Sequence, residues 1–189
     1  DIAIGNVIAT LKDEGVYENT LIFYFSDNGG AKKVSANNLP FRDYKQSVYE
    51  GGLRVPFVIS WPKMFSPATC NEPVISFDIL PTICAALDIE LPKDRVYDGK
   101  NIFPAIRGEL KEPLHPELFW DGNQNKWAVR MENWKLVSPK SEVFELYNLK
   151  NDLGEKNNLA KQHPEKVNKL KEKYTNWRNE MATPMGDKK

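Results

Sequence analysis

Two polar side chains that follow an apolar run are the first candidates for chemistry. Residues 21–25 are all apolar or aromatic, and they lead through Ser26 into Asp27, Asn28 and two glycines. A carboxylate and a carboxamide supply the hard oxygen ligands that Ca²⁺ accepts in its flexible coordination shell. In open α/β sheets the ligand crevice lies outside the carboxyl ends of the strands. Asp27 and Asn28 are therefore predicted to bind a hard divalent metal ion.

A hairpin turn is the alternative interpretation of the same residues. Asn-Gly is a strong hairpin signal because both residue types tolerate positive φ. A hairpin needs an alternating return strand, however, and residues 31–40 do not have that pattern. Two ligands do not complete a metal site, so the metal interpretation also requires further oxygen donors.

A long polar segment over residues 31–49 contains the third candidate, Lys45. Segments of this length without regular structure are usually functional, and residues 37–40 carry a turn signal. A lysine ammonium near a metal could neutralise a tetrahedral oxyanion, although a loop lysine taken alone is more often just solvated. The two glycines after Glu50 would let the backbone turn sharply back toward the sheet. Arg54 is predicted to pair with an acid such as Glu50.

The remaining candidates have simpler interpretations. Cys70 and Cys84 do not form a CxxC pair; a disulfide between them is possible, but two buried thiols are favoured. With only two histidines in the chain, a zinc site is not expected. For His115, between two prolines, a surface or capping role is favoured over catalysis. Three tryptophans could line a carbohydrate surface, but aromatic residues of a small sheet more often form its core: Trp120, Trp127 and Trp134.

Composition and charge give no reason to expect a nucleic-acid or membrane partner. Lysine plus arginine equals aspartate plus glutamate at 26 each, so the formal net charge is zero. No apolar run approaches the roughly 20 residues that span a bilayer. The length of 189 residues suits one ordinary domain, or a domain with a small appendage.

Hydrophobic periodicity predicts an α/β arrangement in the first part of the chain. An amphipathic helix is expected over residues 2–14, and a strand of the parallel type, buried on both faces, over residues 21–25. Residues 55–61 form a second strand, and residues 77–87 form a helix that tolerates Pro81 in its first turn. Two strands are too few for a parallel sheet covered by helices. We therefore expect this part to be the tail end of a larger sheet whose earlier strands are missing.

The pattern changes after a boundary rich in proline and glycine at residues 108–116. Short aromatic or alternating segments predict an antiparallel meander over residues 118–120, 127–137 and 143–149. A closing helix follows Pro164. The predicted domains are residues 1–112 and residues 113–189.

These residues, in this order, resemble the carboxyl-terminal part of the sulfatase family, and the likeness covers nearly the whole chain. The likeness rests on an ordered set of motifs rather than on any single one. The motifs are the helix of residues 1–11, Asn19-Thr20-Leu21, Ser26-Asp27-Asn28-Gly29-Gly30, Pro40-Phe41-Arg42-Asp43-Tyr44-Lys45, Tyr49-Glu50-Gly51-Gly52-Leu53-Arg54-Val55-Pro56, Phe77-Asp78-Ile79-Leu80-Pro81-Thr82, Asp98-Gly99-Lys100-Asn101, Trp134-Lys135-Leu136 and Glu145-Leu146-Tyr147-Asn148-Leu149.

The resemblance implies an alkaline-phosphatase-like fold, with a large mixed sheet between helices and a smaller antiparallel sheet packed with a carboxyl-terminal helix. It matches Asp27 and Asn28 to the family's second pair of metal ligands, usually for calcium. It matches Lys45 to the lysine that contacts the substrate sulfate. The usual Gly-Gly before that lysine is Asp43-Tyr44 here. Half of the calcium shell would be present, and that half-site is expected to bind weakly or stay empty in this chain alone.

The resemblance also implies a formylglycine nucleophile made from a cysteine or serine in a Cys/Ser-x-Pro/Ala-x-Arg context. Neither cysteine has that context, so the nucleophile, the first pair of metal aspartates and a catalytic histidine are expected upstream of Asp1. The chain alone should be inactive, with the missing amino-terminal part of the same protein as its partner. A sulfated small molecule or carbohydrate is the implied substrate, in a periplasmic or secreted protein.

Two alternatives stay open at this point. The first is a phosphate or phosphonate ester hydrolase of the same superfamily. The second is a non-catalytic calcium-binding or interaction module.

Overall fold

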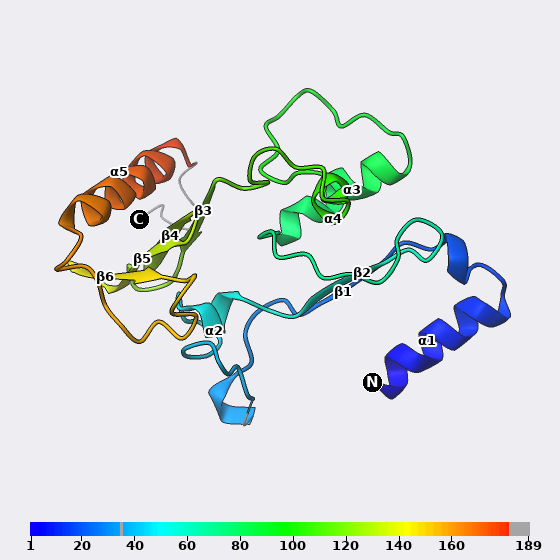
Figure 1. Cartoon of the computed structure of the whole chain (residues 1–189), viewed down its shortest axis with the longest axis horizontal. Helices are drawn as coiled ribbons and strands as arrows, with labels where there is room; N and C mark the ends of the chain where they lie inside the picture. Colours follow the sequence, from blue (N-terminus) through cyan, green and yellow to red (C-terminus); the bar gives the residue numbers. More distant parts are fainter. Residues whose placement is uncertain (35, 182–189) are drawn as a thin grey trace, which may run out of the picture. The chain divides into compact units, whose positions relative to one another are not determined.

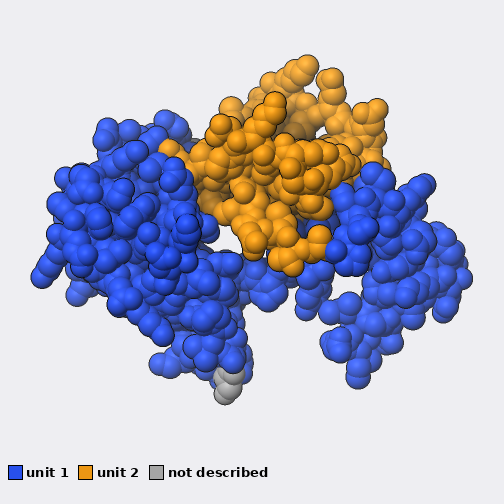
Figure 2. Space-filling model, viewed as in Figure 1, with its two compact units in different colours: residues 1–67, 119–189 blue, residues 68–118 orange. Residues whose placement is uncertain are grey.

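The computed structural model describes residues 1–34 and 36–181. These residues form two compact units, which Figure 2 distinguishes by colour: the described residues of 1–67 together with 119–181, and residues 68–118. The domain boundary expected between residues 112 and 113 stays a prediction. No helix in the described ranges is long and apolar enough to cross a membrane.

The amino-terminal elements of the first unit match the hydrophobic periodicity. Helix α1 covers Ile2–Asp13, strand β1 covers Ile22–Phe25 and strand β2 covers Phe57–Ser60. Between the strands, the described residues form only the 3₁₀ turn Lys32–Val34 and the short helix α2, Glu50–Leu53. The expected helix, both strands and the long irregular segment are therefore confirmed.

The strand pairing differs from the expectation. Strand β1 runs antiparallel to β2, with Ile22 opposite Ser60 and Phe25 opposite Phe57 (Figure 1). Phe23 and Phe25 pack around Phe57, but Tyr24 keeps 51% of its surface exposed and Phe25 keeps 37%. The parallel assignment was wrong because an apolar run reports burial and not strand direction. The predicted burial on both faces is also absent within the described chain, since no residue of β1 is fully buried there.

The carboxyl-terminal meander is confirmed. Its four strands are hydrogen-bonded in chain order and are followed by one long helix: β3 Glu117–Asp121, β4 Trp127–Met131, β5 Trp134–Lys140, β6 Val143–Asn148 and α5 Pro164–Glu180. The predicted segment 127–137 is two strands, because the chain reverses at Glu132, whose φ is 55°.

The two faces of this sheet bury different partners. On one face Val129, Leu136 and Leu146 form a core with Leu170 and Tyr174 of α5. Figure 1 shows α5 lying along the sheet. On the other face a second core joins the sheet to the segment just before α2: Val48, Tyr49, Ala128, Val137, Tyr147 and Leu149. Because side chains alternate along a strand, Lys135 shares this second face with Val137. The sheet thus supports the chain segment that follows Lys45.

The second unit is organised around Asp78, which is fully buried where the 3₁₀ turn Ser76–Asp78 meets helix α3, Ile79–Ala86. Its carboxylate accepts hydrogen bonds from the backbone N–H of Ile75 (2.8 Å) and Lys100 (2.7 Å). His115 Nε2 lies 2.9 Å from both carboxylate oxygens. The surface role expected for His115 is wrong, since its ring is buried against this carboxylate.

The rest of this unit contains the short helix α4, Phe103–Ile106, and both cysteines. Ile102 N–H donates to Thr82 Oγ1 at 3.0 Å, which ties the start of α4 to α3. Cys70 and Cys84 are both free thiols, so the disulfide is absent. Cys70 is exposed, which corrects the expectation that both thiols are buried.

Candidate functional site

Asp27 and Asn28 lie immediately beyond the last residue of β1, at its carboxyl end. Ser26 fixes this strand end, because its N–H donates to Pro56 O (3.4 Å) and its hydroxyl donates to Asn28 O (2.8 Å). The Asp27 side chain is exposed and Asn28 is half-buried. The hairpin alternative is wrong, since β1 pairs with β2 and not with residues 31–40.

Gly29 and Gly30 allow the backbone to approach its neighbours closely. Gly29 N–H donates to Gly52 O at 3.0 Å. A methyl group on Gly29 would collide with the carbonyl of Gly51, and one on Gly30 would collide with Ala36 Cβ. Neither glycine has positive φ. These two positions therefore require glycine because it lacks a side chain, and not because of its conformational freedom.

Lys45 is brought to this strand end by its own backbone. Lys45 N–H donates to Gly30 O at 3.1 Å. The Asn38 carboxamide reinforces the contact, because Oδ1 accepts Gly30 N–H (3.0 Å) while Nδ2 donates to Gly30 O (3.1 Å) and Asp43 O (3.0 Å). The structure thus assembles the three predicted site residues around one pair of glycines. The sequence analysis marked Asn38 only as part of a turn.

The three predicted side chains have no partner among the described residues. Within residues 1–34 and 36–181, the side chains of Asp27, Asn28 and Lys45 form no hydrogen bond or ion pair. A hard cation fits the carboxylate and carboxamide oxygens. The described ranges contain no group of three or more His, Cys, Asp or Glu residues that could hold a metal. The donors present are right in kind but too few for a calcium shell of about six to eight oxygens.

The backbone on both sides of Lys45 enters the left-handed region that favours glycine. Asp43 has φ of 71° and Gln46 has φ of 72°. Asp43 stands where the sulfatase pattern has a glycine, and aspartate is among the residues that enter this left-handed region more readily. Asp43 therefore has a positive φ although it is not a glycine.

Three buried charged side chains, Glu50, Lys135 and Glu155, contact one another at the start of α2. Lys135 Nζ donates to Glu50 Oε1 at 2.7 Å and lies 3.0 Å from Glu155 Oε1, at ion-pair distance but without hydrogen-bond geometry. Glu155 Oε2 accepts the N–H of Glu50 at 2.7 Å. Burial raises the pKa of the Glu155 carboxyl above its usual range, against the opposing effect of Lys135. The expected partner of Arg54 is confirmed, with Arg54 Nη1 3.8 Å from Glu50 Oε2.

Arg42 forms a second connection between the loop and the sheet. Its Nη1 donates to Tyr147 Oη (2.8 Å) and to the backbone oxygen of Glu155 (3.0 Å), and the guanidinium stacks 3.8 Å from the Tyr49 ring centroid. Both tyrosine hydroxyls donate to Glu145 Oε2. Burial, followed by these hydrogen bonds, raises the pKa of Tyr49 and Tyr147. Both therefore remain neutral hydrogen-bond donors at physiological pH.

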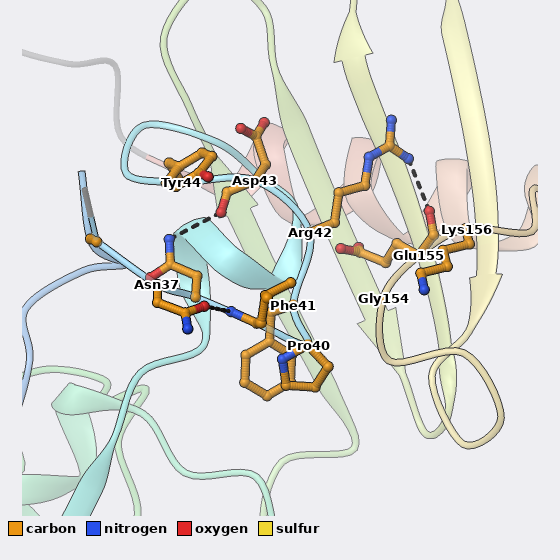
Figure 3. Close-up of a pocket in the computed structure, with 12 residues that line it drawn as sticks. Asn37, Pro40, Phe41, Arg42, Asp43, Tyr44, Gly154, Glu155 and Lys156 are labelled. Atoms are coloured by element: carbon orange, nitrogen blue, oxygen red, sulfur yellow. Dashed lines mark hydrogen bonds between the residues drawn. The ribbon is translucent and has the colours of Figure 1, made fainter. Parts of the chain in front are cut away.

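An open pocket of about 660 Å³ lies beside this connection, between residues 36–44 and 154–156. Figure 3 shows Arg42 extending from the loop toward Glu155. None of Asp27, Asn28 and Lys45 lines the pocket. The cavity is therefore separate from the three unpaired side chains.

The three tryptophans pack at the edges of the two cores of the carboxyl-terminal sheet. Trp120 packs against the core that contains Val48 and Tyr49, and Trp127 and Trp134 pack against the core beneath α5. Trp127 stacks on Tyr174 at 4.0 Å between ring centroids. Their core role is confirmed.

Solved structures with this arrangement define the class of the fold. The crystal structure of Ps i-CgsB in complex with k-i-k-neocarrahexaose matches with a TM-score of 0.83 and 31% identity, over 92% of this chain and 40% of that chain. The phosphonate monoester hydrolase of Agrobacterium radiobacter matches with a TM-score of 0.68 and 23% identity, over 93% of this chain and 38% of that chain, and shows the fold alone. The fold is alkaline-phosphatase-like.

Sequence comparison then gives the family. The family model described as Sulfatase matches residues 1–89. A sulfatase of Formosa agariphila is 32% identical over 98% of this chain and 39% of its own length. The chain belongs to the sulfatase family. It spans between 23% and 39% of the length of the first curated relatives that it matches.

Proposed function

We propose that this chain is the carboxyl-terminal part of the catalytic region of a sulfatase, which hydrolyses sulfate esters. Asp27 and Asn28 supply two oxygen ligands of a calcium ion, and Lys45 contacts the substrate sulfate. One observation carries the proposal. Two hard oxygen donors and one ammonium, all without partners among the described residues, are carried by segments that Gly29–Gly52 and Gly30–Lys45 backbone hydrogen bonds join at a strand end.

A calcium ion at this position would supply positive charge that polarises the sulfate oxygens. The residues of this chain have simpler tasks. Asp27 and Asn28 present their oxygens at the rim of the strand end, and Lys45 can donate up to three hydrogen bonds to sulfate oxygens. The glycine contacts fix the positions of these groups before substrate binds. Electrostatic stabilisation of a transition state requires such preorganised groups.

The nucleophile in this proposal is a formylglycine from sequence that precedes Asp1, together with the other metal ligands. The exposed apolar strands support this part. Tyr24 and Val58 keep 51% and 54% of their surfaces exposed on the β1–β2 pair. Contiguous exposed apolar surface usually marks an interaction site. Its proposed occupant is the preceding part of the same protein, which would add strands and helices to this sheet.

The proposed substrate class is a sulfated carbohydrate. Its support is the related Ps i-CgsB structure, which was solved in complex with a neocarrahexaose. The similarity fits the exposed location of Lys45 and Asp27, which a large sugar could approach from solvent.

The test is Lys45→Ala in the complete protein, assayed on sulfate esters. Removal of a donor that stabilises developing charge should lower kcat by roughly 100-fold or more. Lys161→Ala is the matched control, because Lys161 is also an exposed lysine but lies just before α5. Near-normal turnover by Lys45→Ala would refute the assignment.

A phosphate or phosphonate ester hydrolase is the second candidate, favoured only by the fold shared with the phosphonate monoester hydrolase. Parallel assays of the complete protein on sulfate, phosphate and phosphonate esters separate the two activities. We expect the highest kcat/KM on the sulfate ester.

A non-catalytic calcium-binding module is less well supported, because the apolar surface of β1 and β2 is exposed. A stable isolated chain that binds calcium tightly, in a protein without ester hydrolysis, would establish the module instead.

A further inference from the structure

The segment that carries Lys45 is attached at both ends to the carboxyl-terminal sheet and the turn after it. Before Lys45, Arg42 Nη1 donates to the backbone oxygen of Glu155 at 3.0 Å. After Lys45, the N–H of Glu50 donates to Glu155 Oε2 at 2.7 Å. Lys135 of β5 completes the second attachment through Glu50 Oε1 at 2.7 Å. Glu155 therefore contacts both ends of the segment.

These attachments continue into the candidate site through the backbone. Gly51 N–H donates to Arg42 O at 2.7 Å, so the two ends of the segment are also joined to each other. Gly52 O then accepts the N–H of Gly29, next to Asn28. A shift of α2 would therefore move the partner of Gly29 and release the turn that holds Lys45.

Stability alone does not explain the buried charges. Lys135 and Glu155 have no exposed surface, and Glu50 has 4% of its side chain exposed. Buried ion pairs repay their desolvation poorly, and apolar side chains of similar volume often serve stability as well or better. The charged groups instead provide directional hydrogen bonds. These bonds fix the orientation of the Glu50 N–H, and with it the position of α2.

We propose that Glu155 and Lys135 are positioning residues for sulfate-ester hydrolysis. Their side chains act through Glu50 of α2, and the backbone oxygen of Glu155 acts through Arg42, to hold the Lys45 ammonium in a fixed position relative to Asp27 and Asn28. This inference rests on the function proposed above. It assigns the carboxyl-terminal sheet a role in catalysis although none of its residues touches the substrate.

The first experiment is a double-mutant cycle in the complete protein. Glu155→Ala removes the acceptor of the Glu50 N–H and one partner of Lys135. Misplacement of a binding group by about 1 Å can cost roughly 100-fold in rate, so kcat/KM should fall by roughly 10- to 100-fold. If Glu155 acts through Lys45, the same substitution should have little further effect in the Lys45→Ala background. Equal losses in both backgrounds would overturn the proposal.

Leu136→Ala is the matched structural control. Leu136 follows Lys135 in β5, is fully buried, and faces α5 instead of α2. This variant should unfold at a lower temperature but keep its kcat/KM wherever it is folded. A loss of activity in Leu136→Ala equal to that in Glu155→Ala at matched stability would also overturn the proposal.

A second variant keeps the test valid if Glu155→Ala does not fold. Lys135→Met with Glu155→Met removes one positive and one negative charge together and leaves Glu50 facing Arg54. We expect it to fold with stability near that of the parent protein while kcat/KM falls by roughly 10-fold or more. Full activity in this folded variant would contradict a positioning role.

Hydrogen exchange gives a readout that does not depend on turnover. The amides of Gly29, Gly30 and Lys45 should exchange faster in Glu155→Ala than in Leu136→Ala, because their hydrogen bonds lie along the proposed path. Unchanged exchange at these amides in Glu155→Ala would refute the path. If Lys45→Ala hydrolyses sulfate esters as fast as the parent protein, the proposed function fails. If Lys45→Ala lowers kcat/KM but Glu155→Ala does not, only the positioning role is refuted.

Discussion

At the scale of single residues, the site is defined by polar side chains that the described chain leaves without partners. Other polar side chains here have protein partners: Asp78 and Asn38 each contact three protein groups. Asp27, Asn28 and Lys45 differ from them, although backbone hydrogen bonds of Gly29 and Lys45 hold the segments that carry these side chains. Fixed position combined with unused hydrogen-bonding capacity is the property expected of groups that bind a ligand.

Asp27→Ala in the complete protein should weaken calcium binding, because it removes the one charged ligand that this strand end supplies. Calorimetric titration with Ca²⁺ measures the change in affinity. Asp13→Ala, at the exposed last residue of α1, should bind calcium like the parent protein. Equal affinities for Asp27→Ala and Asp13→Ala would remove Asp27 from the ligand set.

The carboxyl of Glu155 predicts a pH dependence of stability. Its pKa in the folded chain is raised above the ordinary 4.5, chiefly by burial; the charge of Lys135 opposes this rise and the charge of Glu50 adds to it. Between the ordinary pKa and the raised one, the folded state binds more protons than the unfolded state, so stability falls as pH rises. Glu155→Gln should remove this decline. Denaturant unfolding from pH 4 to 7 measures it, and parallel pH profiles for the two proteins would contradict the assignment.

At the scale of elements, the site depends on how closely two backbone segments approach. The strand end at Gly29 and Gly30 lies against α2 and the segment before it, with no room for a Cβ atom at Gly51 or Gly52 either. Gly29 permits the contact between the strand end and α2, Gly30 permits the approach of Ala36, and Gly51 and Gly52 permit the approach of α2 to the carbonyl groups of residues 42–47. This explains why the glycines occur in pairs on both sides of Lys45.

Gly29→Ala should therefore destabilise the protein and reduce its activity, since overpacking a tight contact costs about 1–3 kcal/mol. Gly5→Ala is the matched control, because a methyl group at Gly5 of α1 meets no atom within 4 Å. Replacing this helical glycine should add up to about 1 kcal/mol of stability. Thermal unfolding followed by circular dichroism compares the two, and equal effects would contradict the crowding argument.

The elements were predictable from sequence where a local pattern encodes them. The helical spacing of residues 2–14, the alternating strands after residue 117 and the helix after Pro164 each follow from neighbours in the chain. The direction of β1 was not predictable from sequence, because its apolar run is compatible with either a parallel or an antiparallel partner. Lys135 and Glu155 were also missed, since their partner Glu50 lies 85 and 105 positions away and nothing local marks such a contact. His115 was misplaced for the same reason, as Asp78 lies 37 positions earlier.

At the scale of the whole molecule, the two candidate metal ligands, Asp27 and Asn28, and the exposed strand pair point to the same conclusion. A sheet of two strands with half-exposed aromatic residues does not bury enough apolar surface to be independently stable. The chain also spans at most 39% of the first curated relatives. Under the proposed function, the remaining ligands and the remaining strands come from the same preceding sequence.

The isolated chain should consequently bind calcium weakly or not at all, while the complete protein binds it tightly. Calorimetry on both proteins tests this expectation, because two ligands forgo most of the coordination free energy of a full shell. Tight stoichiometric binding by the isolated chain would contradict the view that its site is half of a calcium site.

Under the proposed function, residues 1–189 belong to a sulfatase whose nucleophile lies in sequence before Asp1. Peptide mass spectrometry of the complete protein tests this placement. We expect a peptide from before Asp1 in which a cysteine or serine of a Cys/Ser-x-Pro/Ala-x-Arg motif has become formylglycine, in a sequence that also contains two neighbouring aspartates. A complete protein without such a motif, or with the motif unmodified in an enzyme that still cleaves sulfate esters, would contradict it.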